Sequence, residues 1–380
     1  MRNSTNRGYR GTALLTLLFA LVSSAHAQST FDLLSGPRPS QSAGVEVYGL
    51  VDSGVVYVNN QGGESNVLLQ GGGGDRPNRL GFRGREDLGG GNQAIFVLEN
   101  GFDVGTGTIS QGGVLFGRQA YVGLKSNDYG MITFGRQYDF MVDLVPYSAP
   151  ASGNAGLYAF HLGDIDRLGG ERLNNSVKYR TPDYNGLQAG AMYSFGGVPG
   201  SIVTNNASSF SLSYAHQSIS LATSYTSIHN YQQGLGIGTN VLGNSLIGYP
   251  QNAMYDKLAV FGAGASYSNG NLFTAALFTS SDLQNAGVSS VLRAYDIGAS
   301  YQILPRLIVG AAATYYKMDS VHWNAFSSSL EYFLSPRTNL YLQYVQLKAS
   351  GTNVQAELFT LPAASDQFQA ALSIGMRYVF

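Results

Sequence analysis

Apolar and polar residues alternate along most of this chain. In the 45–58 segment, the odd positions from Val45 to Val51 are apolar or small, whereas the even positions include Glu46 and Asp52. A period of two is the signature of a β-strand whose two faces meet different environments. Because two acids share one side of this segment, we expect that side to face water.

The final segment shows the same period with a nearly unbroken apolar side. The even positions from 370 to 380 are Ala, Leu, Ile, Met, Tyr and Phe, and the odd positions from 369 to 377 are Gln, Ala, Ser, Gly and Arg. A strand in a soluble sandwich, with one face packed on a second sheet, has the same pattern. The rest of the chain has to show whether this strand belongs to a soluble sandwich or to another kind of sheet.

Sixteen segments carry this alternation, and helical periodicity is absent between them. They are 45–58, 79–86, 93–102, 115–125, 131–138, 172–181, 187–195, 209–217, 219–228, 257–268, 271–279, 291–302, 306–316, 323–334, 339–347 and 367–380. Some neighbours are joined by short turns of Gly, Asn, Asp and Pro, which suit tight turns. The other connections are long, namely 59–78, 103–113, 139–171, 196–208, 229–256, 280–290 and 348–366.

The long connections decide the fold class. Structureless loops beyond about 15 residues are uncommon in compact soluble domains. Outer-membrane barrels, by contrast, have short periplasmic turns and longer extracellular loops. In hydrocarbon every backbone polar group needs an internal partner, so the last strand has to pair with the first. We therefore predict an all-β, 16-stranded antiparallel transmembrane β-barrel.

Composition agrees with this class and excludes others. The chain has 49 Gly, 25 Tyr and 19 Phe but no Cys, so disulfides and thiolate metal sites are excluded. Beyond residue 27 there is no run of 18 apolar residues that could form a transmembrane helix. The formal net charge is −1 at pH 7, without the clustered basic footprint of a nucleic-acid-binding protein.

The N-terminal region has the features of a secretory signal peptide. Arg2, Arg7 and Arg10 precede the apolar stretch 13–22, and Ala-His-Ala at 25–27 is a small-residue cleavage site. We expect residues 1–27 to be removed. Residues 28–43 contain two prolines and no clean period, and we interpret them as an irregular extension before a barrel that covers 44–380.

Several stretches resemble the general porins of Gram-negative outer membranes, in the branch found in β-proteobacteria. They are VEVYGLVDSGV (45–55), NRLGFRGREDLGGGNQAIFVLENGF (78–102), LFGRQAYVGL (115–124), MITFGRQYD (131–139), RLNNSVKY (172–179) and the terminal aromatic strand. The resemblance implies a homotrimer that allows passive diffusion of small hydrophilic solutes and ions. It also implies a third loop that folds inward, narrows the channel and faces basic residues of the barrel wall.

By motif match, the basic wall residues are Arg79 in NRLGF, Arg118 in FGRQAY and Arg172 in ERLNNS, with Arg136 in FGRQYD nearby. Met376, Tyr378 and Phe380 resemble the assembly signal read by the outer-membrane insertion machinery. The chain departs from the family in its 28–43 extension and in Val97, where a polar residue is common. The acids of its third loop do not align with those of the family.

The cost of placing charge in lipid gives a second reason, independent of the resemblance, to expect these arginines to face water. A Lys or Arg on the lipid face at the bilayer midplane costs about 2–4 kcal/mol, so strand faces that carry Arg79, Arg83 or Arg118 should look into water. Rings of charge govern which ions pass through a pore. The alternative is that these side chains only satisfy loop backbones and neighbouring carboxylates.

For the opposite, loop side of the constriction, the predicted acids are Asp143, Asp164 and Asp166, which could equally be solvated loop charges.

Other functions have weaker support. The histidines beyond the signal peptide stand singly without metal spacing, and no serine carries an evident triad, so no catalysis, metal or cofactor is expected. Tyr-rich strands keep open a substrate-selective channel with a saturable site for small organic solutes. The long loops keep open an adhesin or phage receptor, which would lack conductance.

Overall fold

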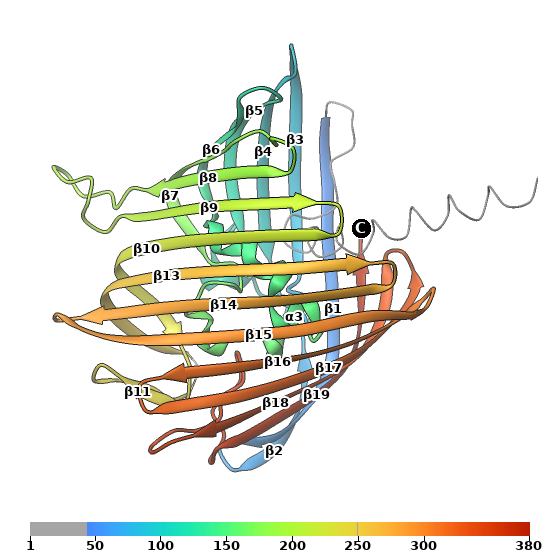
Figure 1. Ribbon diagram of the computed structural model, residues 1–380, viewed down its shortest axis with the longest axis vertical. Coiled ribbons are helices and arrows are strands. Elements are labelled where there is room, and N and C mark those ends of the chain that lie inside the picture. Colours follow the sequence, from blue (N-terminus) through green and yellow to red (C-terminus); the bar gives the residue numbers. More distant parts are fainter. Residues whose placement is uncertain (1–43, 249) are drawn as a thin grey trace, which may run out of the picture.

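The computed structural model describes residues 44–248 and 250–380, so the predicted signal peptide and the 28–43 extension lie outside the described residues. One antiparallel sheet contains 17 strands, and its first strand pairs with its last. The short strand β2 (Glu64–Gln70) pairs with β1 and extends the first long connection. The other sixteen strands form a closed barrel, seen from the side in Figure 1.

Each of the sixteen predicted segments overlaps one barrel strand, so the predicted fold class is confirmed. The strands are β1 (Gly44–Gln61), β3 (Arg79–Gly89), β4 (Asn92–Gly101), β5 (Gln119–Ser126), β6 (Gly130–Tyr138), β7 (Arg172–Arg180), β8 (Leu187–Ser194), β9 (Ala207–His216), β10 (Ile219–Leu235), β13 (Gln251–Asn269), β14 (Leu272–Asn285), β15 (Val288–Leu304), β16 (Leu307–Met318), β17 (Val321–Ser335), β18 (Thr338–Ser350) and β19 (Phe368–Val379). Among the described residues, no helix is long and apolar enough to cross a bilayer.

The barrel closes through β1, which is shared by two neighbours. Its first half pairs with β3 and its second half pairs with β19. Gly49 and Phe380 exchange two backbone hydrogen bonds, each 3.0 Å long. A Cβ at Gly49 would lie 2.4 Å from the Phe380 ring and 2.7 Å from the Arg79 carbonyl oxygen, so the seam requires glycine there. This closure leaves no open sheet edge along the seam, as a membrane interior demands.

The two faces of the barrel wall differ sharply. On β15, Tyr295 and Ile297 are 47% and 67% exposed, whereas Asp296 between them is buried. An apolar exposed face that alternates with a polar face is the pattern of a strand between lipid and lumen. We call the barrel end with the short turns the turn end, and the end with the long connections the loop end.

Two predicted loops are wrong in part. The 280–290 region is the hairpin of β14 and β15, joined by Ala286 and Gly287. The 229–256 region includes the end of β10, the start of β13 and a small hairpin of β11 (Thr239–Val241) and β12 (Asn244–Leu246). The strands extend further because their inward positions, such as Leu283 and Leu292, are buried apolar residues rather than polar ones.

The 139–171 segment follows the polar face of the wall across many strands. The Phe140 N–H donates to Ser209 Oγ on β9 (3.0 Å), and the Ala149 N–H donates to Asp296 on β15 (2.8 Å). Further along, the Ser329 hydroxyl of β17 and the Gln343 amide of β18 donate to the backbone carbonyls of Gly153 and Asn154. The segment therefore reaches from β9 to β18.

This segment contains short helical turns that the alternation pattern did not predict. They are η1 (Phe140–Tyr147), α3 (Ala149–Ser152), η2 (Leu157–Ala159) and η3 (Leu162–Asp164), and a fifth turn, α2 (Ser110–Gly113), lies between β4 and β5. Figure 1 shows α3 within the outline of the ring of strands. The segment packs its apolar side chains in one cluster with inward residues of the wall, including Tyr316 and Trp323.

Two wall glycines make room for α3. A Cβ at Gly298 would lie 2.1 Å from Ser152 Oγ, and one at Gly310 would lie 2.1 Å from the Gly153 carbonyl oxygen. We expect Gly298→Val to push α3 off the wall and to cost about 1–3 kcal/mol, as overpacking does. Thermal melting and proteolysis within 139–171 measure this, and Ala299→Val, on the opposite face, is the control. Equal melting temperatures and equal cleavage within 139–171 in the two variants would contradict the close packing of α3 on Gly298.

Candidate functional site

Three of the predicted wall arginines come together at one place. Arg118, just before β5, donates from Nη2 to the Tyr138 hydroxyl at 2.7 Å. Arg172, at the start of β7, donates to the same hydroxyl at 3.0 Å, and its guanidinium lies 4.7 Å from the Tyr138 ring centroid. Arg79 at the start of β3 interacts electrostatically with Arg118 and Tyr138. We call Arg79, Arg118 and Arg172 the arginine cluster.

The acid of the cluster comes from the wall rather than from the loop. Glu99 on β4 is fully buried and accepts hydrogen bonds from Arg118 Nε (2.7 Å) and the Tyr48 hydroxyl (3.0 Å). The predicted loop acids did not include it. The alternation could have found it, because Glu99 pairs with Gly81 and therefore shares the inward face with Arg79.

Arg79 keeps unused donors. Its Nε donates to the Pro77 carbonyl at 3.3 Å, but its Nη1 and Nη2 are buried and have no hydrogen-bond partner in the structure. Nearly all buried polar groups in proteins are hydrogen-bonded to protein or water, so each exception calls for an explanation. With Glu99 occupied by Arg118 and Tyr48, the cluster holds more positive than negative charge.

The remaining two predicted wall residues lie outside the cluster. Arg83, further toward the turn end of β3, forms an ion pair with Glu46 (2.9 Å) and stacks over the Tyr48 ring at 4.8 Å. Arg136 on β6 donates to the Gly117 carbonyl and to Asn174. Its position along β6 has the parity of the exposed Phe134, so we place it on the outward face.

The predicted loop acids have other partners. Asp143 accepts two hydrogen bonds from Arg180 Nη2, at 2.8 and 2.7 Å. Asp164 is buried and accepts from the Gly169 N–H; burial, with Glu171 and Asp166 nearby, raises the pKa of Asp164 well above its usual range. Within the part of the chain that the structure describes, no hydrogen bond or ion pair joins these acids to the arginine cluster.

His161 joins the third acid to the wall. Its Nδ1 lies 2.5 Å from Asp166 and its Nε2 lies 2.8 Å from Asp296 on β15, while the Thr279 hydroxyl donates to Asp166. Burial alone lowers the pKa of His161, but the two carboxylates hold it well above its usual value. We call His161, Asp166 and Asp296 the histidine bridge; of these three residues the sequence analysis singled out only Asp166.

A second buried network fastens the first long connection to the wall. Asp52 on β1 accepts hydrogen bonds from the backbone N–H groups of Gly74, Asp75 and Arg76. Asp75 in turn forms an ion pair with Arg377 of β19. The 62–78 connection is thereby tied to the two strands that close the barrel.

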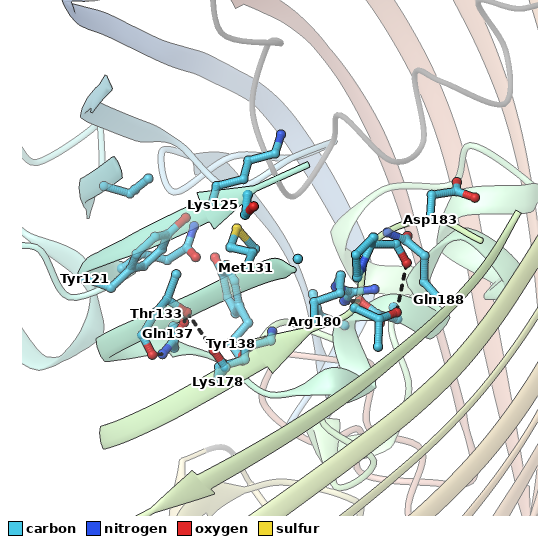
Figure 2. A pocket seen from close by; sticks show the side chains of 18 of the residues that line it. Tyr121, Lys125, Met131, Thr133, Gln137, Tyr138, Lys178, Arg180, Asp183 and Gln188 are labelled. Atoms are coloured by element: carbon cyan, nitrogen blue, oxygen red, sulfur yellow. Dashed lines mark hydrogen bonds and ion pairs between the residues drawn. The ribbon is translucent and has the colours of Figure 1, made fainter. Parts of the chain in front are cut away.

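A cavity of about 550 Å³ opens beside the arginine cluster, toward the turn end. Tyr138 contacts the arginine cluster and also lines the cavity, and Figure 2 shows it beside Gln137, Lys178 and Arg180. The cavity lining includes the cations Arg83, Lys125, Lys178 and Arg180, the acids Asp143 and Asp183, and the aromatic residues Tyr48, Tyr121 and Tyr138. Its charged lining is predominantly positive. Among the described residues, no group of three or more His, Asp or Glu side chains is arranged to hold a metal ion.

A closed sixteen-stranded barrel with an apolar exterior, long connections at one end and charged side chains inside defines a porin-type transmembrane barrel. The chain belongs to the Gram-negative porin family, whose family model matches residues 12–352. Its place is accordingly the outer membrane.

Relatives of known identity agree with this assignment. The chain is 39% identical over 144 residues to an outer membrane porin protein of Bordetella pertussis, an alignment that covers 38% of this chain and 36% of that protein. It is 36% identical over 172 residues to outer membrane porin protein 32 of Delftia acidovorans, covering 42% and 46%. The alignments thus span less than half the length of these two relatives.

Solved structures match over most of the chain. The anion-selective porin from Comamonas acidovorans matches with a TM-score of 0.72 and 24% identity, covering 89% of this chain and all of that one. OmpT of Vibrio cholerae, in its trimer form, matches with a TM-score of 0.65 and 14% identity, covering 90% and 100%. At these identities the likeness concerns the fold.

Proposed function

We propose that the protein forms a water-filled channel for passive diffusion of small hydrophilic solutes and ions. The observation that carries this proposal is the inward-facing arginine cluster in a closed barrel, with Arg79 and Arg118 buried and the adjoining cavity toward the turn end. Charged side chains that line a path control which ions enter and leave it. The 139–171 segment lies along the polar face and, in this proposal, narrows the channel against the arginine cluster.

The balance of inward charge supports a preference for anions. Glu99, the acid near Arg79, is already hydrogen-bonded to Arg118 and Tyr48, and at the cavity Asp143 forms an ion pair with Arg180 while it also lies near Lys178. An excess of fixed positive charge in a narrow passage raises the local concentration of anions. One neighbour in fold, from Comamonas acidovorans, bears the description anion-selective.

The remaining expectations belong to the same proposal. A homotrimer agrees with the trimer form of the similar Vibrio cholerae barrel. Met376 and Tyr378 are exposed on the outer face of β19, where an insertion machinery could read them together with Phe380. The proposal includes no catalysis.

Planar-bilayer recording in a KCl gradient tests the channel and its selectivity. We expect conductance steps in groups of three. We also expect a reversal potential whose sign shows that chloride passes more easily than potassium. Folded protein without any steps would overturn the proposal and would favour an adhesin.

Arg79→Gln tests the arginine cluster within that recording. The change removes a buried cation with unused donors, so we expect the anion preference to fall while the barrel melts at nearly the same temperature. Arg337→Gln removes an equal charge from an exposed position in the turn between β17 and β18 and is the matched control. The same reversal potential in both variants would show that Arg79 does not act on the permeating ions.

The cavity supports a second candidate, a channel selective for small organic solutes. Tyr48, Tyr121 and Tyr138 offer aromatic surface next to cations, and Lys178 lies 4.2 Å from the Phe140 ring centroid. Aromatic groups beside charges suit organic anions better than simple ions. Flux that saturates with the concentration of an organic anion, but not with chloride, would favour this candidate.

A further inference from the structure

The barrel wall is interrupted at the loop end between β7 and β10. There β8 ends at Ser194 and β9 begins at Ala207, whereas β7 begins at Arg172 and β10 continues to Leu235. The connection between β8 and β9 projects beyond the ends of these two strands (Figure 1). Three strand spacings separate β7 from β10, which is about 14 Å between their axes. We call this gap, beyond Ser194 and Ala207, the notch.

Side chains from both faces of the wall line the notch, which encloses a cavity of about 560 Å³. Tyr231 of β10 is one lining residue, and it is buried in the inner apolar cluster. Met254 of β13 is another, and it is 62% exposed. Its neighbour Tyr255 is buried on the inner face, so Met254 points outward. The notch therefore passes from the outer surface to the inner face of the wall.

The inner end of the notch reaches the arginine cluster. Arg172 lines the notch, and its guanidinium donates from Nη2 to the Tyr138 hydroxyl at 3.0 Å and from Nε to the Arg118 carbonyl at 3.3 Å. Tyr138 also lines the 550 Å³ cavity toward the turn end. The notch, the arginine cluster and that cavity thus follow one another from the loop end toward the turn end.

The lining of the notch favours anions. Its charged residues include Arg167 and Arg172 against a single acid, Glu171. Arg167 is buried and forms an ion pair with Asp139 through Nε, but its Nη2 has no hydrogen-bond partner among the described residues. A concave surface lined mainly by one sign of charge raises the local concentration of ions of the opposite sign.

The loop end beside the notch is covered by packed connections. The Gln355 N–H donates to the Gly238 carbonyl at 2.8 Å, and the ring centroids of Phe160 and Phe359 are 5.9 Å apart. Apolar residues of the 139–171, 236–248 and 353–366 segments share one cluster with the inner wall of β13 to β18. These contacts crowd the approach along the barrel axis on that side, whereas the notch lies at the border of the packed region.

We propose that the notch is a side entrance through which small anions reach the arginine cluster from the outer surface. This proposal rests on the proposed channel function and adds a second approach to it, beside the path along the barrel axis. The unused donor of Arg167 and the charge of Arg172 attract an anion into the notch. Arg172 then brings it to the cluster, because its guanidinium belongs to both surfaces.

Thiol labelling during planar-bilayer recording tests the side entrance, because the chain has no cysteine of its own. In the Met254→Cys variant, sulfonatoethyl methanethiosulfonate places a negative charge at the outer rim of the notch, and the trimethylammonioethyl reagent places a positive charge there. A unit charge about 8 Å from a passing ion in water changes the energy of that ion by about RT. At low salt we therefore expect the sulfonate to lower the chloride current by up to about twofold and the ammonium to raise it. Mass spectrometry checks that labelling is complete.

The matched control is Asn240→Cys, at an exposed position of the β11–β12 hairpin in the same 229–256 region but outside the lining of the notch. Either label should change the current little there. Equal sulfonate effects in the two variants, or none in fully labelled Met254→Cys channels that conduct, would overturn the side entrance. Equal losses with both reagents at Met254→Cys would overturn its preference for anions. Unlabelled wild type without conductance would instead overturn the proposed function itself.

Discussion

Deleting Ser148–Gly156 is expected to raise the single-channel conductance severalfold. In the intact chain these residues carry the 139–171 segment from Tyr147, which packs beside Gly264 of β13, to Leu157, whose N–H donates to the Gly74 carbonyl near β1. Neighbouring strands are about 4.8 Å apart, so the strand steps from β13 round to β1 amount to about 34 Å of wall. The shortened segment cannot reach both anchors, and the passage beside the arginine cluster should widen as one of them releases.

A deletion of equal length in a different connection, away from the arginine cluster, is the control. Residues 197–205 connect β8 and β9, and the side chains of Ile202 and Val203 there are well exposed. Their removal should leave the conductance at the wild-type value. If the 148–156 deletion conducts like the wild type while its barrel remains folded, the 139–171 segment does not limit the channel.

Replacing His161 with alanine is expected to release the 139–171 segment from the wall at neutral pH. The change leaves Asp166 and Asp296 buried without their shared cation, and breaking a buried charge pair in this way costs about 3–5 kcal/mol. Faster proteolysis within 139–171 and noisier single-channel currents would report the release. His216→Ala, at an exposed position near the turn end of β9, should change neither.

The histidine bridge also predicts the direction of a pH effect. The pKa of His161 is raised in the folded protein. The stability that protonated His161 contributes is therefore complete below the usual histidine pKa of 6.5 and is lost as the pH rises through the raised pKa. The groups that face it are the carboxylates of Asp166 and Asp296 and the side chains of Thr279 and Tyr316. Wild-type channels should therefore become noisier at alkaline pH, whereas His161→Ala channels should be equally noisy throughout. A wild type that stays quiet at alkaline pH would contradict the bridge.

The sequence predicts the barrel well because each strand separates lipid from lumen. Around Arg79, Arg83 and Glu99, polar residues face inward and apolar residues face outward, so a period of two is visible. The rule fails near the loop end, where Leu283 and Leu292 face inward against apolar loop residues. The usual alternation is reversed there, because the inward positions are apolar and the outward positions include Asp282 and Arg293, and the hairpin of β14 and β15 was therefore taken for a loop.

The position of candidate site residues could be predicted only where local sequence motifs place them on a strand. The three residues of the arginine cluster were found because short strand motifs position them on the inward face. The partners of the loop acids could not be found in this way, since Asp143 meets Arg180 and Asp166 meets His161 through the path of a 33-residue connection. Periodicity contains no information about that path.

The apolar inner surface near the loop end has a consequence for assembly. Residues such as Tyr316 and Trp323 bury themselves against the connecting segments, which can dock only after the wall exists. A one-residue slip before docking would turn inward apolar residues such as Leu292 and Trp323 toward lipid at little cost. The correct pairing of these strands must then be fixed from the turn-end half, where the inward residues Ser329 and Glu331 distinguish the faces. We therefore expect these hairpins to zip from the periplasmic turns outward during insertion.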